Sequence, residues 1–253
     1  MISADSVKNI AFKLGANLCG IAPVERFSQA PEGFRPTDIY EDAQSVVVVA
    51  KRFPEGPFLS RSPIPYTVIN DAILNEVIKI YCYLCIRLEQ EDGTIAVPVP
   101  GDPYEYWDEE KHEGRGILSL RHAGYMAGLG VFGKNTLLTN ATFGNRIVLG
   151  AALLNIELEP DDMVDGAFCS SDCQICIKSC PAGALDGRRV NQKLCRAISQ
   201  GHTKWAIIYI FAIPAGSSAR TERDTKKPAK GEKANGPKDL LYCGCFCRRK
   251  IRR

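Results

Sequence analysis

The sequence predicts an α/β domain of α+β character over residues 1–160, followed by a smaller cysteine-rich domain over residues 161–253. Two observations predict this arrangement. In the first domain, segments with helical periodicity alternate with short apolar segments, which is typical of helices layered on a sheet. Eight of the eleven cysteines lie after residue 168, where the composition changes. With 253 residues, 45% of them hydrophobic, the chain is long enough to bury a core.

The first half of the α/β domain is expected to contain two helices and two strands. Ala4–Ala16 has apolar residues at helical spacing, and Leu18–Ala22 predicts a short strand. Ser45–Ala50 is dominated by valine, which predicts a strand buried on both faces. Tyr66–Gln90 carries a continuous apolar stripe and predicts the longest helix. The segments 23–42 and 53–65 are rich in proline and are expected to be loops.

The second half of this domain is expected to contain another strand, a helix and a hairpin. Thr94–Val99 predicts a strand, and Pro98 places it at a sheet edge or a strand end. Ile117–Leu129 predicts a helix. Thr136–Leu138 and Ile147–Leu154 are expected to pair as a β-hairpin within residues 133–156, around a turn at Gly144.

The N-terminal sequence and the apolar runs exclude two classes of protein. No charged start followed by an apolar run and a cleavage site is present, so a cytoplasmic location is expected. The longest apolar run, residues 205–213, is too short for a helix that crosses a bilayer, so no membrane span is expected. In a reducing cytosol, dense cysteine indicates metal binding rather than disulfides.

The cysteine spacing indicates iron–sulfur clusters. Residues 173–181 read C-x2-C-x3-C-P with a further cysteine four positions before, which differs by one residue from the bacterial iron–sulfur run. A second set of four follows, which predicts a ferredoxin-like domain with two [4Fe–4S] clusters. By the two-cluster rule, one cluster takes Cys169, Cys173, Cys176 and Cys247, and the other takes Cys180, Cys195, Cys243 and Cys245.

A zinc site is the alternative to a cluster. Four cysteines also satisfy tetrahedral Zn²⁺, although the C-x2-C-x3-C-P spacing favours iron and sulfide. The three cysteines outside the two sets, Cys19, Cys82 and Cys85, are interpreted as core residues.

The charge of the chain is divided unevenly. Residues 1–180 hold 15 Lys and Arg against 24 Asp and Glu, whereas residues 181–253 hold 17 against 5. The basic part would offset the negative charge of two clusters, dock an acidic electron donor, bind RNA phosphates or form a solvated tail. Residues 215–238, rich in Lys, Gly, Pro and Ser, are expected to be a mobile surface insertion.

A glycine-rich segment, residues 128–136, precedes the cysteines and reads GLGVFGKNT. It follows a predicted helix and opens a strand, which is the reverse of the dinucleotide-binding order. Asn135 stands where a phosphate-binding loop has its magnesium-binding hydroxyl, so an ATPase is also disfavoured.

The block 122–155, followed by the C-x2-C-x3-C-P run, resembles epoxyqueuosine reductases and their relatives among the cobalamin-dependent reductases, which include reductive dehalogenases. The resemblance covers about residues 5–200. It implies an α/β domain that holds base-off cobalamin and receives electrons from two [4Fe–4S] clusters. It also implies that a row of residues lies along the cofactor: Gly128, Gly130, Gly133, Lys134 and Asn135. The alternative is that these glycines form a tight turn between helix and strand.

The sequence departs from that family at one position of interest. Where the resemblance implies an aspartate that donates a proton, this chain has Gly114. No catalytic residue is therefore assigned, and His112, His122 and His202 have no convincing partners.

The leading hypothesis is an iron–sulfur oxidoreductase that relays electrons through two clusters to cobalamin or a substrate in the α/β domain. Its expected partners are a ferredoxin- or flavodoxin-type electron donor and either a small-molecule substrate or tRNA. The alternative is a non-enzymatic electron carrier or assembly partner that lacks a corrinoid.

Overall fold

The fold is built around a four-stranded antiparallel sheet. The computed structural model describes residues 2–91, 93–202 and 208–210, and the side chains as far as Ser199. The strand order is β1-β2-β8-β3, with every neighbouring pair antiparallel. These strands are β1 (Leu18–Pro23), β2 (Ser45–Arg52), β8 (Ile147–Leu154) and β3 (Ala96–Val99).

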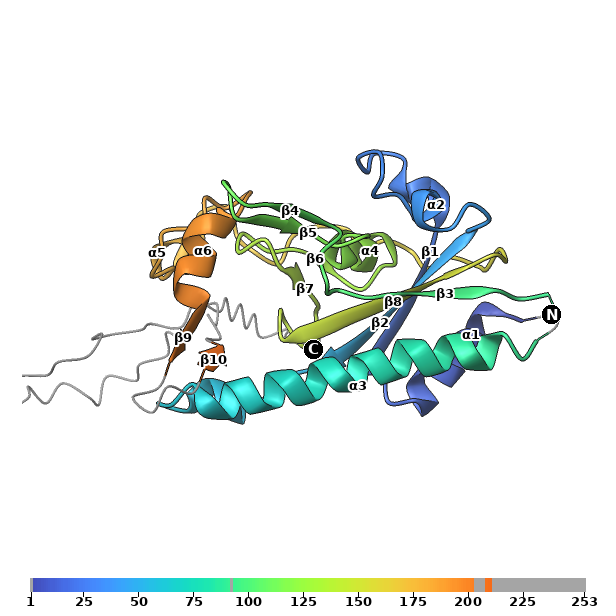
Figure 1. Ribbon diagram of the computed structural model, residues 1–253, viewed down its shortest axis with the longest axis horizontal. Coiled ribbons are helices and arrows are strands. Elements are labelled where there is room, and N and C mark those ends of the chain that lie inside the picture. Colours follow the sequence, from blue (N-terminus) through green and yellow to red (C-terminus); the bar gives the residue numbers. More distant parts are fainter. Residues whose placement is uncertain (1, 92, 203–207, 211–253) are drawn as a thin grey trace, which may run out of the picture.

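Helices cover both faces of this sheet (Figure 1). The helices α1 (Ala4–Lys13) and α3 (Ile64–Leu88) pack on one face, and α4 (Leu120–Met126) packs on the other. Along β2, Val47 and Val49 join the core beside α1 and α3, whereas Val46 and Val48 join the core beside α4. The prediction of a strand buried on both faces is confirmed, and the covering helices explain why an antiparallel strand can be apolar throughout.

Most of the expected elements are present with shifted ends. The predicted helix Tyr66–Gln90 begins at Ile64, because Pro65 suits the first turn of a helix. The strand expected over Thr94–Val99 is the edge strand β3, as Pro98 indicated. The expected loops contain short helices, which are η1 (Val24–Phe27), α2 (Pro36–Ile39) and η2 (Gly56–Leu59).

The prediction of a hairpin over residues 133–156 was wrong in its pairing. Within this region, β7 (Leu138–Thr139) pairs with β6 (Val131–Phe132), and β8 enters the main sheet between β2 and β3. The inner half of β8, residues 150–154, is fully buried. A strand paired only in a surface hairpin would leave one of these apolar faces in water.

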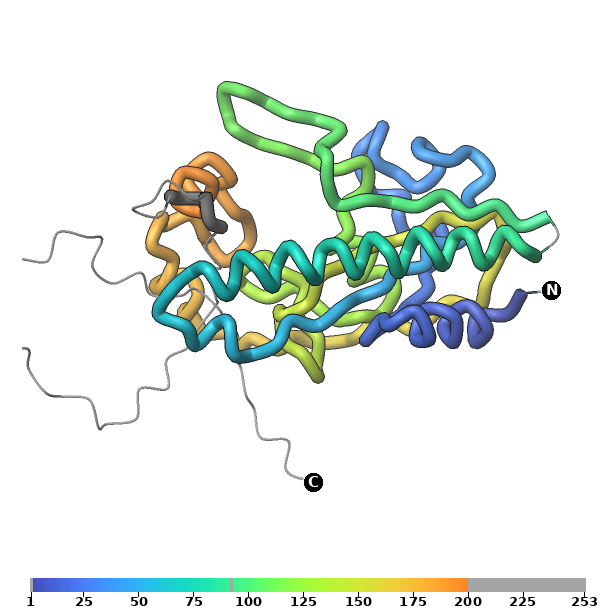
Figure 2. Tube along the Cα trace, turned by 60° about the horizontal axis from the view of Figure 1, so that its bottom comes forward, coloured from blue at the N-terminus to red at the C-terminus, as the bar shows by residue number. Residues whose placement is uncertain are grey.

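The predicted helix Ile117–Leu129 is shorter than expected. It spans only α4, because the backbone at Gly128 adopts a φ of +71°, which ends a helix. Two strands were not predicted, namely β4 (Tyr106–Asp108) and β5 (Glu113–Arg115). They form an antiparallel hairpin that projects from the body of the molecule (Figure 2).

The cysteine-rich segment lies at one end of the sheet domain (Figure 1). It contains α5 (Ile175–Lys178), α6 (Gln192–Ser199) and the antiparallel pair β9 (Gln200–His202) and β10 (Ile208–Ile210). The expected insertion over residues 215–238 lies outside the described residues. Within the described ranges, no helix is both long enough and apolar enough to cross a bilayer.

Candidate cluster-binding cavity

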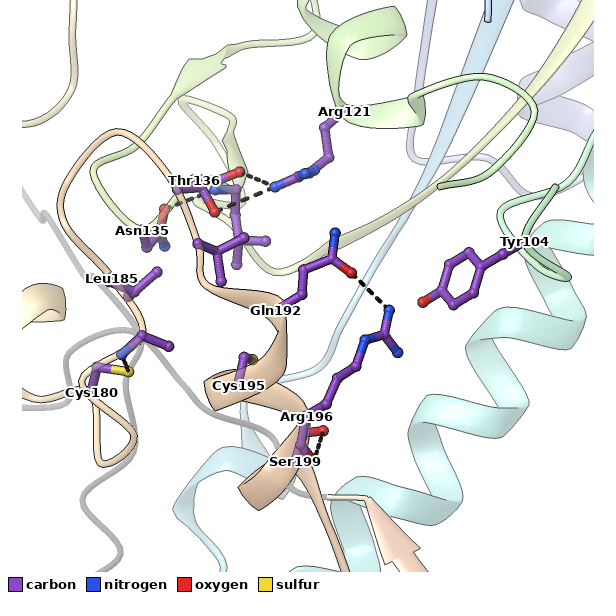
Figure 3. A pocket seen from close by; sticks show the side chains of 13 residues that line it. Tyr104, Arg121, Asn135, Thr136, Cys180, Leu185, Gln192, Cys195, Arg196 and Ser199 are labelled. Carbon is purple, nitrogen blue, oxygen red and sulfur yellow. Dashed lines mark hydrogen bonds between the residues drawn. The ribbon is translucent and has the colours of Figure 1, made fainter. Parts of the chain in front are cut away.

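A cavity of about 320 Å³ opens where the sheet domain meets the cysteine-rich segment. Figure 3 shows that its walls come from both parts of the chain. The sheet domain contributes Tyr104, Arg121, Asn135, Thr136 and Leu137. The cysteine-rich segment contributes Cys180, Ala184, Leu185, Val190, Gln192, Cys195, Arg196 and Ser199.

Cys180 and Cys195 share this cavity although they come from different elements. Cys180 follows α5, and its Sγ accepts a hydrogen bond of 3.4 Å from the amide of Ala184. Cys195 lies on α6, whose first turn is capped by the side chain of Asn191. Burial raises the pKa of the Cys195 thiol, the neighbouring Cys180 raises it further, and Arg196 lowers it. The structure therefore brings together two of the four cysteines expected to bind one cluster.

The other predicted ligands are not gathered in the same way. Cys176 is fully buried, with Ile177, Cys180 and Leu185 packed against it. Cys169 and Cys173 are half-buried on the loop before α5. Over the described residues, no three His, Cys, Asp or Glu side chains stand close enough to hold a metal ion. Cys243, Cys245 and Cys247 lie outside the described residues, so the assignment of all eight ligands stays a prediction.

Two arginines give the cavity a positive charge. Arg121 donates from Nη1 to the carbonyl of Thr136 and, at 3.3 Å, to its hydroxyl, and burial lowers the pKa of this arginine. Arg196 donates from Nη2 to Oε1 of Gln192 at 2.9 Å. Among the described residues, neither guanidinium has a carboxylate partner. The cavity is therefore suited to a ligand that carries negative charge.

Two buried donors on the cavity wall have no hydrogen-bond acceptor in the described part of the chain. They are Nδ2 of Asn135 and Nε of Arg196. The side chain of Asn135 is fixed, because its Oδ1 accepts from the amide of Leu137 at 3.1 Å and the residue is only 5% exposed. A buried donor without an acceptor costs about 1–3 kcal/mol. Thiolate and sulfide are negatively charged hydrogen-bond acceptors. These donors and the two cysteines therefore fit an iron–sulfur cluster.

Lys134 does not line the cavity but joins the glycine segment to the cysteine loop. Its Nζ donates to the carbonyl of Ser171 at 2.7 Å and to that of Cys173 at 2.9 Å. This contact connects the two sequence motifs directly. The Lys134 ammonium group, which the resemblance places beside a cofactor, is thus hydrogen-bonded to the cysteine loop.

Other parts of the chain occupy the space beside the glycines of this segment. A Cβ at Gly128 would lie 2.2 Å from the carbonyl oxygen of Asp162, and one at Gly130 would lie 2.1 Å from that of Thr139. Gly133 closes a turn, in which its amide donates to the carbonyl of Leu137. Main-chain carbonyls therefore occupy the space that a side chain at Gly128 or Gly130 would need, and the placement of these glycines along a cofactor stays a prediction.

Gly114, at the position where the resemblance implies an aspartate, is also enclosed. A Cβ there would lie 2.6 Å from the ring of Tyr104. The Gly114 amide donates to Oε1 of Gln192 at 3.0 Å, and its carbonyl accepts from Nε2 of the same side chain at 3.2 Å. The β4–β5 hairpin is thereby fastened to α6, and no acidic side chain enters the cavity from this position.

Several of these residues were not found by sequence reasoning, namely Tyr104, Arg121, Gln192 and Arg196. Gln192 lies 78 positions from Gly114, and no spacing rule connects them. The one available signal was the basic character of the chain after residue 180.

Sequence comparison relates the chain to one enzyme family over a short segment. No family model matches it. The epoxyqueuosine reductase of Listeria monocytogenes is 43% identical over 70 residues, which cover 27% of this chain and 18% of that protein. The epoxyqueuosine reductase of Staphylococcus aureus is 39% identical over 82 residues, or 32% and 21% of the two chains. The match therefore spans about a fifth of these relatives.

Structural comparison extends the likeness to most of the chain. The epoxyqueuosine reductase from Streptococcus thermophilus aligns with a TM-score of 0.53 and 20% identity, covering 76% of this chain and 56% of that one. A variant of a catabolic reductive dehalogenase aligns with a TM-score of 0.54 and 19% identity, covering 72% and 25%. The fold is thus that of the reductases to which epoxyqueuosine reductase and the reductive dehalogenases belong. Over the short segment matched in sequence, the chain is homologous to epoxyqueuosine reductases.

Another solved epoxyqueuosine reductase contains an epoxyqueuosine-modified tRNA stem loop. It aligns with a TM-score of 0.52 and 18% identity, covering 74% of this chain and 54% of that one.

Proposed function

We propose that the protein is an iron–sulfur oxidoreductase that passes electrons, by way of the cavity at Cys180 and Cys195, to a substrate or cofactor held beside the sheet domain. The observation that carries this proposal is the placement of two predicted cluster ligands and two unpaired cations on one cavity. Partial homology to epoxyqueuosine reductases supports it. A [4Fe–4S] cluster, when bound, supplies one-electron transfer.

The described residues have distinct tasks in this proposal. Cys180 and Cys195 supply two thiolates, and Arg121 holds the Thr136 wall of the cavity. Tyr104, just before β4, forms part of the cavity wall. Residues 161–253 act as the electron-transfer domain, with two clusters in all, and receive electrons from a ferredoxin- or flavodoxin-type donor.

Cobalamin is implied by the resemblance, but no step is assigned to it. Main-chain packing alone explains the described surroundings of Gly128 and Gly130, so they add no support for cobalamin. A titration of reduced protein with cobalamin, followed by its absorption spectrum, tests whether the protein binds it. A spectral shift that saturates near one equivalent would restore it to the proposal.

Anaerobic reconstitution tests the proposal. The wild type is expected to hold about eight irons and eight sulfides, and dithionite is expected to reduce it. Cys195→Ser should lower the iron content, whereas the matched control Cys82→Ser, on α3, should keep it. Reoxidation of the reduced protein by an epoxyqueuosine-containing tRNA stem loop then tests the substrate class. Wild-type protein with no bound iron would overturn the proposal.

A second candidate is a non-enzymatic electron carrier, and the enclosure of Gly114 favours it. The ring of Tyr104 fills the space that an acidic proton donor would need. A carrier would exchange electrons with a reduced ferredoxin and with a protein acceptor, yet would reduce neither the tRNA stem loop nor a small organic acceptor. Turnover of the stem loop under these conditions excludes this candidate.

A further inference from the structure

We propose that Arg196 and Asn135 set the reduction potential of the group bound by Cys180 and Cys195, by donating hydrogen bonds from Nε and Nδ2. This inference rests on the proposed function and adds to it two residues that no cysteine pattern indicates. The two donors are buried without acceptors in the described part of the chain, and both belong to residues that line the cavity with the two thiols.

The orientation of Arg196 is fixed from three sides. Its guanidinium carbon lies 5.0 Å from the ring centroid of Tyr104 and 5.0 Å from that of Trp107. The two rings are stacked in parallel, with 6.2 Å between their centroids. Its Nη2 is engaged by Gln192. Aromatic contact and this hydrogen bond hold the planar group in place, and its Nε is a buried donor without an acceptor among the described residues.

Asn135 approaches the same space from the opposite wall (Figure 3). Its carbonyl oxygen is committed to the amide of Leu137, which leaves Nδ2 without an acceptor. The residue is one of few buried polar side chains in the described structure, and an amide donor is costly to bury unpaired. The two donors thus flank the cavity from separate parts of the chain.

The charges determine the direction of the effect. Reduction adds one electron, supplied by dithionite or a donor protein, and changes the charge of a cubane with four thiolates from about −2 to about −3. A cation and N–H donors stabilise the more negative form, because charge-assisted hydrogen bonds strengthen with the charge of the acceptor. Arg196 and Asn135 therefore raise the potential, and their removal lowers it.

The β4–β5 hairpin has a positioning role in this scheme. Tyr104 and Trp107 lie before and within β4, and the pairing of Gly114 with Gln192 fastens β5 to α6. Lys193 adds a contact from its Nζ to the carbonyl of Glu110 at 3.1 Å. The hairpin thus connects the sheet domain to the environment of the two thiols without contacting them.

The experiment measures iron content and reduction potential on the same samples. We compare the full-length wild type with three variants, Arg196→Gln, Asn135→Asp and Trp107→Leu. Each protein is reconstituted anaerobically and assayed for iron and sulfide. It is then titrated with dithionite in the presence of mediators, and electron paramagnetic resonance follows the reduction. Asn135→Asp keeps the acceptor for Leu137 and replaces the amide donor by a carboxylate, so that the lost hydrogen bond and the added negative charge both act on the potential. Arg188→Gln, an exposed arginine of the same segment, is the matched control.

We expect Arg196→Gln to shift the one-electron equilibrium of one cluster about tenfold toward the oxidised form, or about 59 mV. Asn135→Asp should shift it in the same direction, Trp107→Leu by less, and Arg188→Gln not at all. Unchanged potentials in fully loaded Arg196→Gln and Asn135→Asp would overturn the inference. If Arg196→Gln fails to load, Trp107→Leu decides, because it changes no charge. Loss of clusters from the wild type would instead refute the proposed function.

Discussion

The replacement of Gly128 by alanine distinguishes a glycine needed for packing from one needed for cofactor approach. Gly128 has a φ of +71°, a conformation that costs an alanine about 1–2 kcal/mol. The added Cβ would also lie 2.2 Å from the Asp162 carbonyl oxygen, so the chain there must move by about 1 Å to reach an ordinary C···O separation. Such overpacking costs about 1–3 kcal/mol.

The two costs together predict a loss of about 2–5 kcal/mol from the free energy of unfolding, reduced by about 0.4–1 kcal/mol because alanine restricts the unfolded chain. The assay is urea unfolding of protein without cofactor, followed by circular dichroism. Gly144→Ala is the matched control, because Gly144 has a φ of +62° but nothing within 4 Å of the added Cβ. If the two variants lose the same stability, the packing role of Gly128 is wrong.

Three further predictions concern other parts of the molecule. Asp161→Ala removes a 2.6 Å ion pair with Lys8 and a 2.9 Å hydrogen bond from the amide of Ile21. Urea unfolding should therefore show that the free energy of unfolding falls by about 1–3 kcal/mol. An unchanged urea midpoint would contradict this prediction. Gly114→Asp places a side chain against a tyrosine ring, so it should lower the melting temperature and produce no epoxide reduction; a stable, active variant would refute the enclosure of this site. Burial raises the pKa of Cys85 from 9.0 to about 12, so the unfolded chain loses its proton first and stability should fall between pH 9 and about 12. Cys85→Ala should flatten that decline in urea unfolding at several pH values, and a wild-type slope in the variant would argue against the shift.

The sheet core could be predicted because its signals are local. A run of valines in β2 and a 25-residue apolar periodicity in α3 predict elements whose burial is decided within each segment. The pairing of β8 could not be predicted in this way. Its partners lie about 50 and 100 positions earlier in the chain, and local turn signals favoured a nearer strand.

In the candidate site, too, residues with a local sequence signal were predicted and residues that depend on distant contacts were not. Cys180 was found because cluster ligands have a characteristic spacing, and Cys195 because the remaining cysteines complete a second set of four. Arg196 and Gln192 were missed because their importance depends on the β4–β5 hairpin, which carries no strand signal and is placed by contacts to α6. The glycine segment was recognised, but its role depends on Asp162 and Thr139, whose carbonyls fill the space beside it.

The iron content of the double variant Cys180→Ser/Cys195→Ser tests the central claim most directly. If these two thiols hold one of two [4Fe–4S] clusters, anaerobically reconstituted double variant should contain about four irons and four sulfides where the wild type contains about eight. The remaining cluster should still give a paramagnetic signal on reduction. A double variant that retains the full wild-type content of iron and sulfide would contradict the assignment of this cavity to a cluster.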